Sequence, residues 1–569
     1  MFLLLFAADV LCAQTRLVSG ILKDEESGTA VAFAVISDLK RDHGTLSNES
    51  GAFLLGLKVP ADSLVIESMG YVSKRIALAA ADDLGVILLK PEITFLPEVN
   101  IVPEDDAYLF EMLQRSKKNH LSDKRISKAY FELKSLDDQG QIELLESYHN
   151  VHLNGMDISD IELKSGRVAL RHHDRNYFLS MEGSKAVSMM RVFEHTSFFP
   201  EHPLSVSAKQ AKKMFRLSKR GVFLDQDGHE NILILYRPRN VCASCFEGRI
   251  IIDLTSGTLK QMSYSCKDCV SYPFVPVFPE DSIAHVKMEI TKIFDGHFLK
   301  QVSLRYGTEY HSRVGKEDAK TFEVSTNAVL HCYESDQPFF IPKFHFPESL
   351  NDYKRMAAIP MQTDFWNHRD EMHIDANVVE NDRFFAHDSS ITNENLFKHD
   401  GMGFHRLMRY HYVHWSANRI LLGQVVDDTL TRIPPSTPIS ERYQLTAQIF
   451  LDLMEHGDSL VITTDAIFDP YQSYYYLEQD SITNAFVNMY FDLCETERRV
   501  LDRELKTFCQ DRSCVESRYE SFIKKHEEVM QRFLREVDRG TAKDAMLRWN
   551  EKLKLETGID NLRLFGVYQ

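Results

Sequence analysis

The 569-residue sequence lacks an excess of basic residues, and this excludes one broad class of function. Its 66 lysines and arginines are outnumbered by 83 aspartates and glutamates, which gives a formal net charge of −17. Nucleic-acid binding needs a concentrated basic footprint, and none is present. Beyond the first residues the sequence also lacks any run near the ~20 apolar residues that a membrane-spanning helix requires. With 44% hydrophobic residues, the composition predicts a globular protein of several domains.

The motifs of common enzyme classes are missing as well. There is no His-Glu-x-x-His zinc motif, no Gly-x-Ser-x-Gly nucleophile elbow, no phosphate-binding glycine loop and no dinucleotide fingerprint. The sequence also has no internal repeat and no low-complexity segment. It therefore predicts no catalytic residue, no cofactor and no metal ligand, and it favours a protein that is not an enzyme.

The first 14 residues indicate export. Residues 1–8 are almost purely apolar, and Val10-Leu11-Cys12-Ala13-Gln14 closes this run with small residues. This pattern is typical of a signal peptide cleaved near Ala13 or Gln14, although the usual positive start is missing and the true start codon is open. Asp9-Val10-Leu11 lacks the small residues that precede a lipid-modified cysteine. We expect a periplasmic or outer-membrane-associated protein, at most peripherally attached to the membrane.

Residues 16–89 predict a small β-sandwich. Four short strand-like segments alternate with turn sequences such as Glu49-Ser50-Gly51, and about seven short strands in so few residues are typical of a sandwich. The expected strands that are clearest in the sequence cover residues 17–22, 32–36, 52–57 and 63–68.

The order of several short motifs in this region carries a resemblance. Val18-x-Gly20, Gly44-Thr45, Gly51-x-Phe53, Gly70-Tyr71 and Leu96-Pro97-Glu98-Val99 follow one another. In this order they resemble the carboxypeptidase-regulatory-like domain, a transthyretin-like sandwich at the start of exported Bacteroidota envelope proteins. Ser47-Asn48 departs from the Thr-Asp usual in that family. The resemblance implies a structural module with no catalysis of its own.

Residues 127–312 predict a large curved antiparallel sheet. Val286, Met288 and Ile290 alternate with polar residues before a turn at Asp295-Gly296, which indicates a hairpin with one buried face. The expected shape is similar to the half-barrels of lipoprotein carriers. Five short segments resemble corresponding segments in a group of uncharacterised Bacteroidota surface proteins. They are residues 131–133, Glu146-Ser147-Tyr148, Lys164-Ser165-Gly166-Arg167, residues 248–253 and Asp364-Phe365-Trp366.

The C-terminal end changes to helical periodicity. Helices are expected at 482–508, 515–538 and 542–555, the last two ended by Gly540 and Gly558. The predicted fold class is therefore mainly β with a C-terminal α region. The predicted division is a signal peptide at 1–14, a β-sandwich at 15–92, a linker and helix at 93–124, an antiparallel β domain at 125–312, a mixed strand-rich and His-rich region at 313–480, and a helical region at 481–569.

Four cysteines form the sharpest local pattern. Cys242-x-x-Cys245 and Cys266-x-x-Cys269 flank a hairpin that turns near residues 255–257, so the two pairs are expected to lie opposite each other. In an exported chain this favours nested disulfides, Cys242–Cys269 and Cys245–Cys266, while a structural zinc site and unpaired thiols stay open. Cys509 and Cys514 are also disulfide candidates, whereas Cys332 and Cys494 are expected to be unpaired.

Two sets of possible metal ligands have no suitable spacing. Residues 364–414 are rich in histidine, and Asp492, Glu495 and Glu497 share a helical region with His526, but the Glu-x-x-His pairs of a metal bundle are missing. Arg498 and Arg499 next to these acids indicate ordinary surface ion pairs. The histidines of the first set are His368, His373, His387, His399, His405, His411 and His414.

The sequence thus favours an exported cell-envelope protein that acts as a non-catalytic binding or assembly module. Its expected partner is an envelope protein or a glycan. The alternative is a metal-dependent, carboxypeptidase-like hydrolase that uses the His-rich region, and clustering of those histidines with a carboxylate would favour it.

Overall fold

A computed structural model gives the architecture of the chain. It describes residues 15–39, 44–58, 63–68, 70–78, 82–91, 106–171, 183–224, 228–240, 244–274, 276, 281–313, 320–335, 337–344, 346, 352–360, 365–366, 371–393, 411–426, 437–456 and 459–568. The predicted signal peptide lies outside these residues. Among the described helices, none is long and apolar enough to cross a membrane.

The N-terminal region is a sandwich of two small sheets, as the predicted fold class requires. One sheet has the order β4-β1-β7 and the other β3-β2-β5-β6, and Val18, Ile36, Phe53 and Ile66 meet between them. Gly51 has a φ of +78°, and a Cβ there would lie 2.3 Å from the carbonyl oxygen of Leu22, so only glycine fits. The strands are β1 (Thr15–Asp24), β2 (Val35–Asp38), β3 (Gly44–Leu46), β4 (Ala52–Lys58), β5 (Ser63–Glu67), β6 (Lys74–Ala77) and β7 (Asp83–Leu89).

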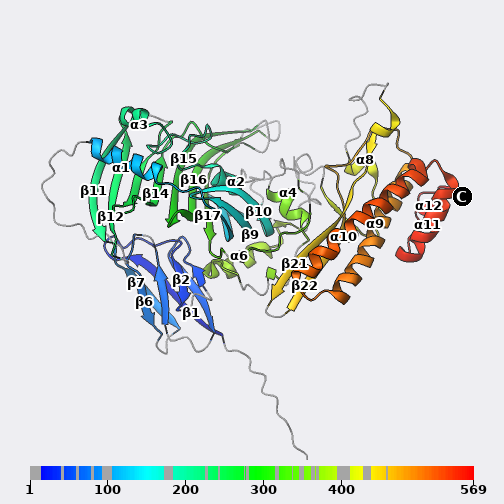
Figure 1. Ribbon diagram of the computed structural model, residues 1–569, viewed down its shortest axis with the longest axis horizontal. Helices are drawn as coiled ribbons and strands as arrows, with labels where there is room; N and C mark the ends of the chain where they lie inside the picture. The colour runs from blue at the N-terminus through cyan, green and yellow to red at the C-terminus, as the bar shows by residue number, and fades with distance from the viewer. Residues whose placement is uncertain are drawn as a thin grey trace, which may run out of the picture.

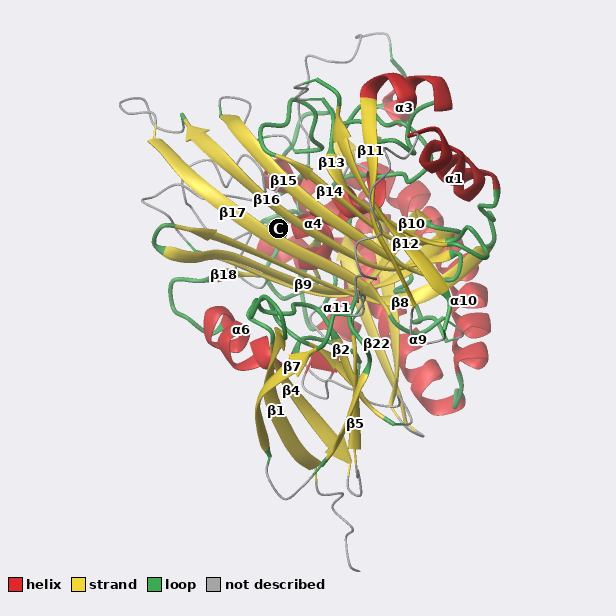
Figure 2. Ribbon diagram, turned by 90° about the vertical axis from the view of Figure 1, so that its left-hand side faces the viewer, coloured by secondary structure: helices red, strands yellow, loops and turns green. Residues whose placement is uncertain are grey.

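The middle of the chain forms one long antiparallel sheet of eleven strands. Its order is β11-β12-β13-β14-β15-β16-β17-β8-β9-β10-β18, and Figure 2 shows the strong twist of these strands. The strands are β8 (Lys124–Asp137), β9 (Gly140–Asn154), β10 (Asp157–Leu170), β11 (Phe215–Leu224), β12 (Glu230–Pro238), β13 (Glu247–Asp253), β14 (Leu259–Cys266), β15 (Ser282–Asp295), β16 (Phe298–Ser312), β17 (Lys320–Cys332) and β18 (Ile391–Thr392).

The sheet extends further than the predicted β domain. That domain was expected to end at residue 312, yet β17 pairs with both β16 and β8, and β18 adds an edge next to β10. The two predicted hairpins are present: β13 pairs with β14 from Glu247 opposite Ser265 onward, and β15 pairs with β16. The register of a hairpin depends on its local turn, so the sequence could predict it. The pairing of β17 with β8 joins segments that are far apart in the sequence, and the alternation of apolar residues does not show which distant strands pair.

The two faces of this sheet are covered by different parts of the chain. The face that carries Phe131, Leu145 and Ile290, here called the inner face, packs against α1 (Asp106–Lys118), α2 (Gly183–Met189) and α4 (Asp352–Ala358). The opposite or outer face carries Tyr130 and Tyr148 and is partly covered by the N-terminal sandwich and by residues 365–366 and 371–385. Figure 1 shows the sandwich below the sheet.

The C-terminal region has a core of its own. The hairpin of β21 (Ala447–His456) and β22 (Ser459–Phe468) packs on α9 (Ser481–Phe508), and the other helices complete this layer, which is coloured orange and red in Figure 1. A buried ion pair joins it to the central sheet, because Lys164 Nζ donates to Asp452 Oδ1 over 2.5 Å. The helices are α10 (Arg512–Val537), α11 (Lys543–Thr557) and α12 (Asn561–Leu564).

Candidate functional site

Several of the short motifs singled out in the sequence meet on the outer face of the sheet. Trp366 Nε1 donates to Ser165 Oγ over 3.1 Å, and the Arg167 guanidinium lies 4.8 Å from the Trp366 ring centroid. The Tyr148 ring is 5.1 Å from that of Phe365. Segments some 200 residues apart in the sequence thus build one aromatic and charged cluster. Asp364 lies outside the described residues.

Two buried glutamates form the centre of this outer-face network. The Tyr130 hydroxyl lies 3.0 Å from one carboxylate oxygen of each of Glu132 and Glu146, and Asn381 Nδ2 donates to both over 3.1 Å. Asn377 Nδ2 donates to Glu132 over 2.9 Å. Burial, reinforced by the neighbouring Glu146, raises the pKa of Glu132, while Lys134 opposes the shift.

Arg167 compensates the second glutamate and closes the network. Its Nη2 lies 2.6 Å from Glu146 Oε2, and its Nη1 lies 3.0 Å from Asp382 on α6 (Val378–Phe385). The N-terminal sandwich is held at the same place, because Asn48 donates to Asn377 and Thr45 Oγ1 donates to the carbonyl oxygen of His373. The carboxylates of Glu132 and Glu146 each have several partners. The network joins the central sheet, α6 and the N-terminal sandwich, so it fits a structural role.

The inner face is covered by a segment without regular structure. Residues 190–206, here called the strap, bury Val192, Phe199 and Leu204 in the inner-face core. Charged side chains hold the strap by its backbone: Lys117 Nζ donates to the carbonyl oxygens of Phe193 and Leu204 over 2.7 and 3.0 Å. Backbone pairing holds the strap at Glu201, which bridges to Cys245.

Two further charges anchor the start of the strap from the sheet. Lys292 Nζ on β15 donates to the carbonyl oxygen of Met190 over 2.5 Å, and Asp157 Oδ1 accepts from the Val192 N–H over 2.9 Å. Lys292 is fully buried and only 3.9 Å from Asp157. Burial lowers the pKa of Lys292 to about 8, although Asp157 opposes the shift.

Beside Lys292 lie buried polar atoms that find no partner in the described part of the chain. They are the hydroxyl of Tyr264, which is 1% exposed, and Nδ1 of His202, which is 2% exposed. The two rings are 4.9 Å apart. Burial lowers the pKa of His202 to about 3, so its imidazole is neutral and Nδ1 can accept a hydrogen bond. Buried polar groups are almost always bonded, so this inner-face cluster has unused hydrogen-bonding capacity.

Sequence reasoning missed the inner-face cluster, although one signal for it existed. Lys292 continues the alternation of Val286, Met288 and Ile290 and so occupies a position on the apolar side of its strand. A lysine on the buried side of a strand is rare and marks a special environment. His202 lies in irregular structure and carried no such signal.

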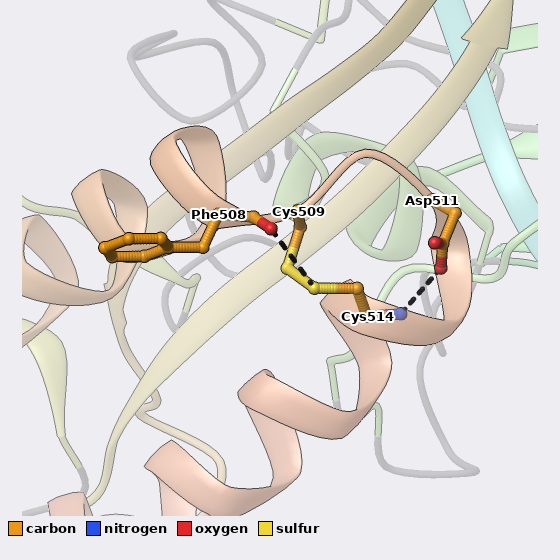
Figure 3. The surroundings of a disulfide bond; sticks show 4 residues. All are labelled: Phe508, Cys509, Asp511 and Cys514. Carbon is orange, nitrogen blue, oxygen red and sulfur yellow. Dashed lines mark hydrogen bonds between the residues drawn. A yellow bond between two sulfur atoms is a disulfide. The ribbon is translucent and has the colours of Figure 1, made fainter.

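The cysteine predictions have mixed outcomes. Cys509 and Cys514 form a disulfide between α9 and α10, where Asp511 caps α10 by accepting from the Cys514 N–H (Figure 3). Cys242 lies outside the described residues, so the Cys242–Cys269 bond stays a prediction. Cys245, Cys266 and Cys269 are buried, and the Cys245–Cys266 bond stays a prediction too. Cys332 and Cys494 are buried thiols as well.

The described histidines of the His-rich region lie in separate surroundings. His373 Nε2 is 2.8 Å from Asp375, His414 Nδ1 is 2.7 Å from Asp465 on β22, and His387 bonds Ser389. His411 lies just before β19 (Val413–His414). Within the described ranges, no three potential metal ligands come together. His368, His399 and His405 lie outside these ranges.

The acids of the C-terminal helices are more buried than predicted. Glu495 does pair with Arg498 and Arg499, both at 2.7 Å, but it is only 3% exposed, so the acidic partner of these expected surface ion pairs is buried. Asp492 pairs with Arg419 instead, over 2.9 Å. His526 lies 3.9 Å from the Cys494 thiol. Burial raises the pKa of Glu497.

Comparison with known proteins adds distant structural neighbours. No protein-family model and no curated protein matches the sequence. The complex of MucA and MucB from Pseudomonas aeruginosa is 8% identical, covers 38% of this chain and 92% of the matched chain, and gives a TM-score of 0.15. A LolA superfamily protein from Nitrosomonas europaea is 8% identical, covers 40% of this chain and 94% of its own, and gives a TM-score of 0.14. At these TM-scores, function has to be argued from this chain's own residues.

Proposed function

We propose that the chain is an exported cell-envelope protein that acts as a non-catalytic binding module, with its ligand site on the inner face beneath the strap. The apolar segment at residues 1–8, followed by small residues, supports export. The N-terminal sandwich, proposed to be a carboxypeptidase-regulatory-like domain, and the outer-face network serve as the scaffold that fixes the sheet.

One observation carries the binding proposal. The Tyr264 hydroxyl and His202 Nδ1 lie unbonded in the described part of the molecule, next to Lys292, inside an otherwise apolar core. Leaving a buried polar atom without a partner costs about 1–3 kcal/mol, and ligand sites are typically apolar with a few such groups. The ligand class that fits is an amphiphile with an apolar body and a hydrogen-bonding head group, such as an acylated envelope molecule.

The strap supplies a route to this site. Apart from one backbone bridge, in which the Glu201 N–H donates to the Ser244 carbonyl oxygen and the Glu201 carbonyl oxygen accepts from the Phe246 N–H, side chains hold the strap to the sheet and α1. Such single bonds exchange with water more readily than a paired strand does. Opening residues 190–206 would expose Lys292 and Tyr264 while leaving the strand ladder intact.

A binding titration tests the proposal. The full chain would be titrated with a fluorescent long-chain acyl probe, and we expect saturable binding that weakens about tenfold in Lys292→Met and in Tyr264→Phe. Tyr236→Phe is the matched control, because the Tyr236 hydroxyl already donates to the Ser263 carbonyl oxygen over 2.9 Å. Absence of saturable binding, or equal weakening in the control, would contradict the inner-face site.

Cell fractionation tests the location separately. We expect the mature chain outside the cytoplasm, with its N-terminus near Gln14 or Thr15. An uncleaved cytoplasmic protein would contradict export without bearing on the inner-face site.

A further inference from the structure

The polar groups of the inner-face cluster come from two different parts of the chain. His202 belongs to the strap, whereas Tyr264 lies on β14 and Lys292 on β15 of the sheet. A lysine ammonium can only donate hydrogen bonds, and a tyrosine hydroxyl can donate or accept them. A neutral imidazole has one N–H and one bare nitrogen, so the role of His202 depends on which nitrogen carries the hydrogen.

The strap itself fixes the hydrogen on the His202 ring. The ring makes a hydrogen bond to the backbone of Arg191, and this bond favours the protonated ring, so a carbonyl oxygen accepts it. Nδ1 is without a partner among the described residues, so Nε2 makes this bond and carries the hydrogen. Burial lowers the pKa of His202 to about 3, although the bond to Arg191 opposes the shift, so the ring is neutral. Nδ1 is therefore a fixed acceptor that needs a donor.

The side chains around His202 do not supply this donor. The Tyr264 hydroxyl, on a ring 4.9 Å away, also lacks a partner in the described part of the chain, so it does not donate to Nδ1. The Ser205 hydroxyl donates to the carbonyl oxygen of His202 over 2.9 Å, and Lys292 donates to that of Met190. A donor for Nδ1 is therefore left for a ligand to bring.

We propose that the ligand head group carries a hydroxyl, which accepts from the sheet and donates to His202 Nδ1 on the strap. This inference rests on the inner-face ligand site proposed above. A hydroxyl oxygen accepts from Tyr264 or Lys292 while its own hydrogen bonds Nδ1. An ether or ester oxygen only accepts, so it leaves Nδ1 buried without a partner, which costs about 1–3 kcal/mol. The ligand class is thus a neutral, hydroxyl-bearing amphiphile, such as a long-chain alcohol or a glycerol monoester.

The same hydroxyl would hold the strap closed. His202 moves with residues 190–206, whereas Tyr264 and Lys292 stay with the strand ladder. A ligand that bonds both parts joins them, so the strap should open less often once the site is filled. A ligand that only accepts bonds the sheet alone and leaves the opening of the strap as it was.

Two probes that differ by one hydrogen-bond donor test the inference. A long-chain alcohol and its methyl ether share the same chain and the same acceptor oxygen, and each would displace the fluorescent acyl probe from the full chain. We expect the alcohol to bind about tenfold more tightly than the ether. We also expect the alcohol, but not the ether, to slow amide hydrogen exchange in residues 190–206. Equal affinities would overturn the inference and leave the inner-face site intact. If neither compound bound, the site itself would be wrong, and the inference with it.

Variants of His202 and Tyr264 separate the two halves of the hydroxyl's role. His202→Leu removes the acceptor and should abolish the preference for the alcohol, whereas His202→Asn places an amide oxygen near Nδ1 and should keep it. Tyr264→Phe is the matched control, because it should weaken both probes alike and leave their ratio unchanged. A preference that survives in His202→Leu would overturn the inference. The comparison of the two probes in the unaltered chain does not depend on the folding of any variant.

Discussion

The outer and inner faces of the same sheet hold buried polar groups in opposite ways. On the outer face, Glu132 and Glu146 each have several partners, and Arg167 supplies the opposite charge. On the inner face, Lys292 has a single carbonyl oxygen at hydrogen-bond distance and an acid 3.9 Å away, and Tyr264 lacks a partner among the described residues. A bonded network fixes a shape, whereas unused donors and acceptors in an apolar core suit a ligand.

Breaking the outer-face network should have the largest effect. Arg167→Met leaves the carboxylate of Glu146 buried without its opposite charge, so we expect the free energy of unfolding to fall by about 3–5 kcal/mol. Urea unfolding measures this. Lys506→Ala, which removes an exposed ion pair with Asp502, is the control and should cost less than about 0.5 kcal/mol. A loss that small for Arg167→Met would show that the network is dispensable.

On the inner face, removing the buried charge of Lys292 should have the opposite effect and raise the free energy of unfolding. With a pKa of about 8 in the folded chain and 10.5 in the unfolded one, Lys292 binds fewer protons when folded, so stability rises with pH through this window. Lys292→Met should remove that rise and stabilise the chain by roughly 3 kcal/mol below pH 8, less the lost bond to Met190. Urea unfolding at pH 7 and pH 10 measures both. Destabilisation at both pH values would contradict the comparison.

Acid should destabilise the chain through buried histidines of the sheet and the strap. Burial lowers the pKa values of His149, His202 and His331 to about 3, so the folded chain keeps them neutral while the unfolded chain takes up protons below pH 6.5. Each should cost about 2 kcal/mol of stability at pH 5. His331→Gln should reduce the loss between pH 7 and pH 5, and the exposed His387→Gln should leave it unchanged. An identical pH dependence in both variants would refute this assignment.

The smallest expected effect is a difference in stability between variants of two tyrosines in the inner-face core. Tyr236→Phe removes a made hydrogen bond and should cost about 1 kcal/mol, whereas Tyr264→Phe removes an unbonded hydroxyl and should cost nothing or add stability. Thermal unfolding of the ligand-free chain measures the difference. Equal losses would mean that the Tyr264 hydroxyl is already bonded.

The sequence predicted the fold class and the local pairings well, because these depend on short-range patterns. Strand alternation and the turn around Gly257, whose φ is +74°, were enough to place β13 opposite β14. The helices α9, α10 and α11 begin and end close to their predicted limits. Burial of Glu495 was not foreseen, because its ion pairs with Arg498 and Arg499 look the same in sequence whether they are buried or exposed.

The candidate site depends on contacts that no local pattern encodes. Lys292 meets the strap at Met190, about 100 residues earlier in the sequence, and Asp157 meets it from a different strand. Trp366 reaches Ser165, which lies 201 residues earlier in the sequence. Only the position of Lys292 on an apolar strand face was visible beforehand; which residues surround it follows from the tertiary fold.

The strand order has a consequence for how the chain is made. β8 lies between β9 and β17, and Leu133 pairs with Ala328, about 200 residues further along the chain. When β8, β9 and β10 have formed a meander, one edge of β8 therefore stays open until β17 has been synthesised. Non-local pairing of this kind slows folding, and an open apolar edge invites pairing with other chains. We therefore expect the unfinished sheet to be most prone to pairing with other chains before β17 joins β8.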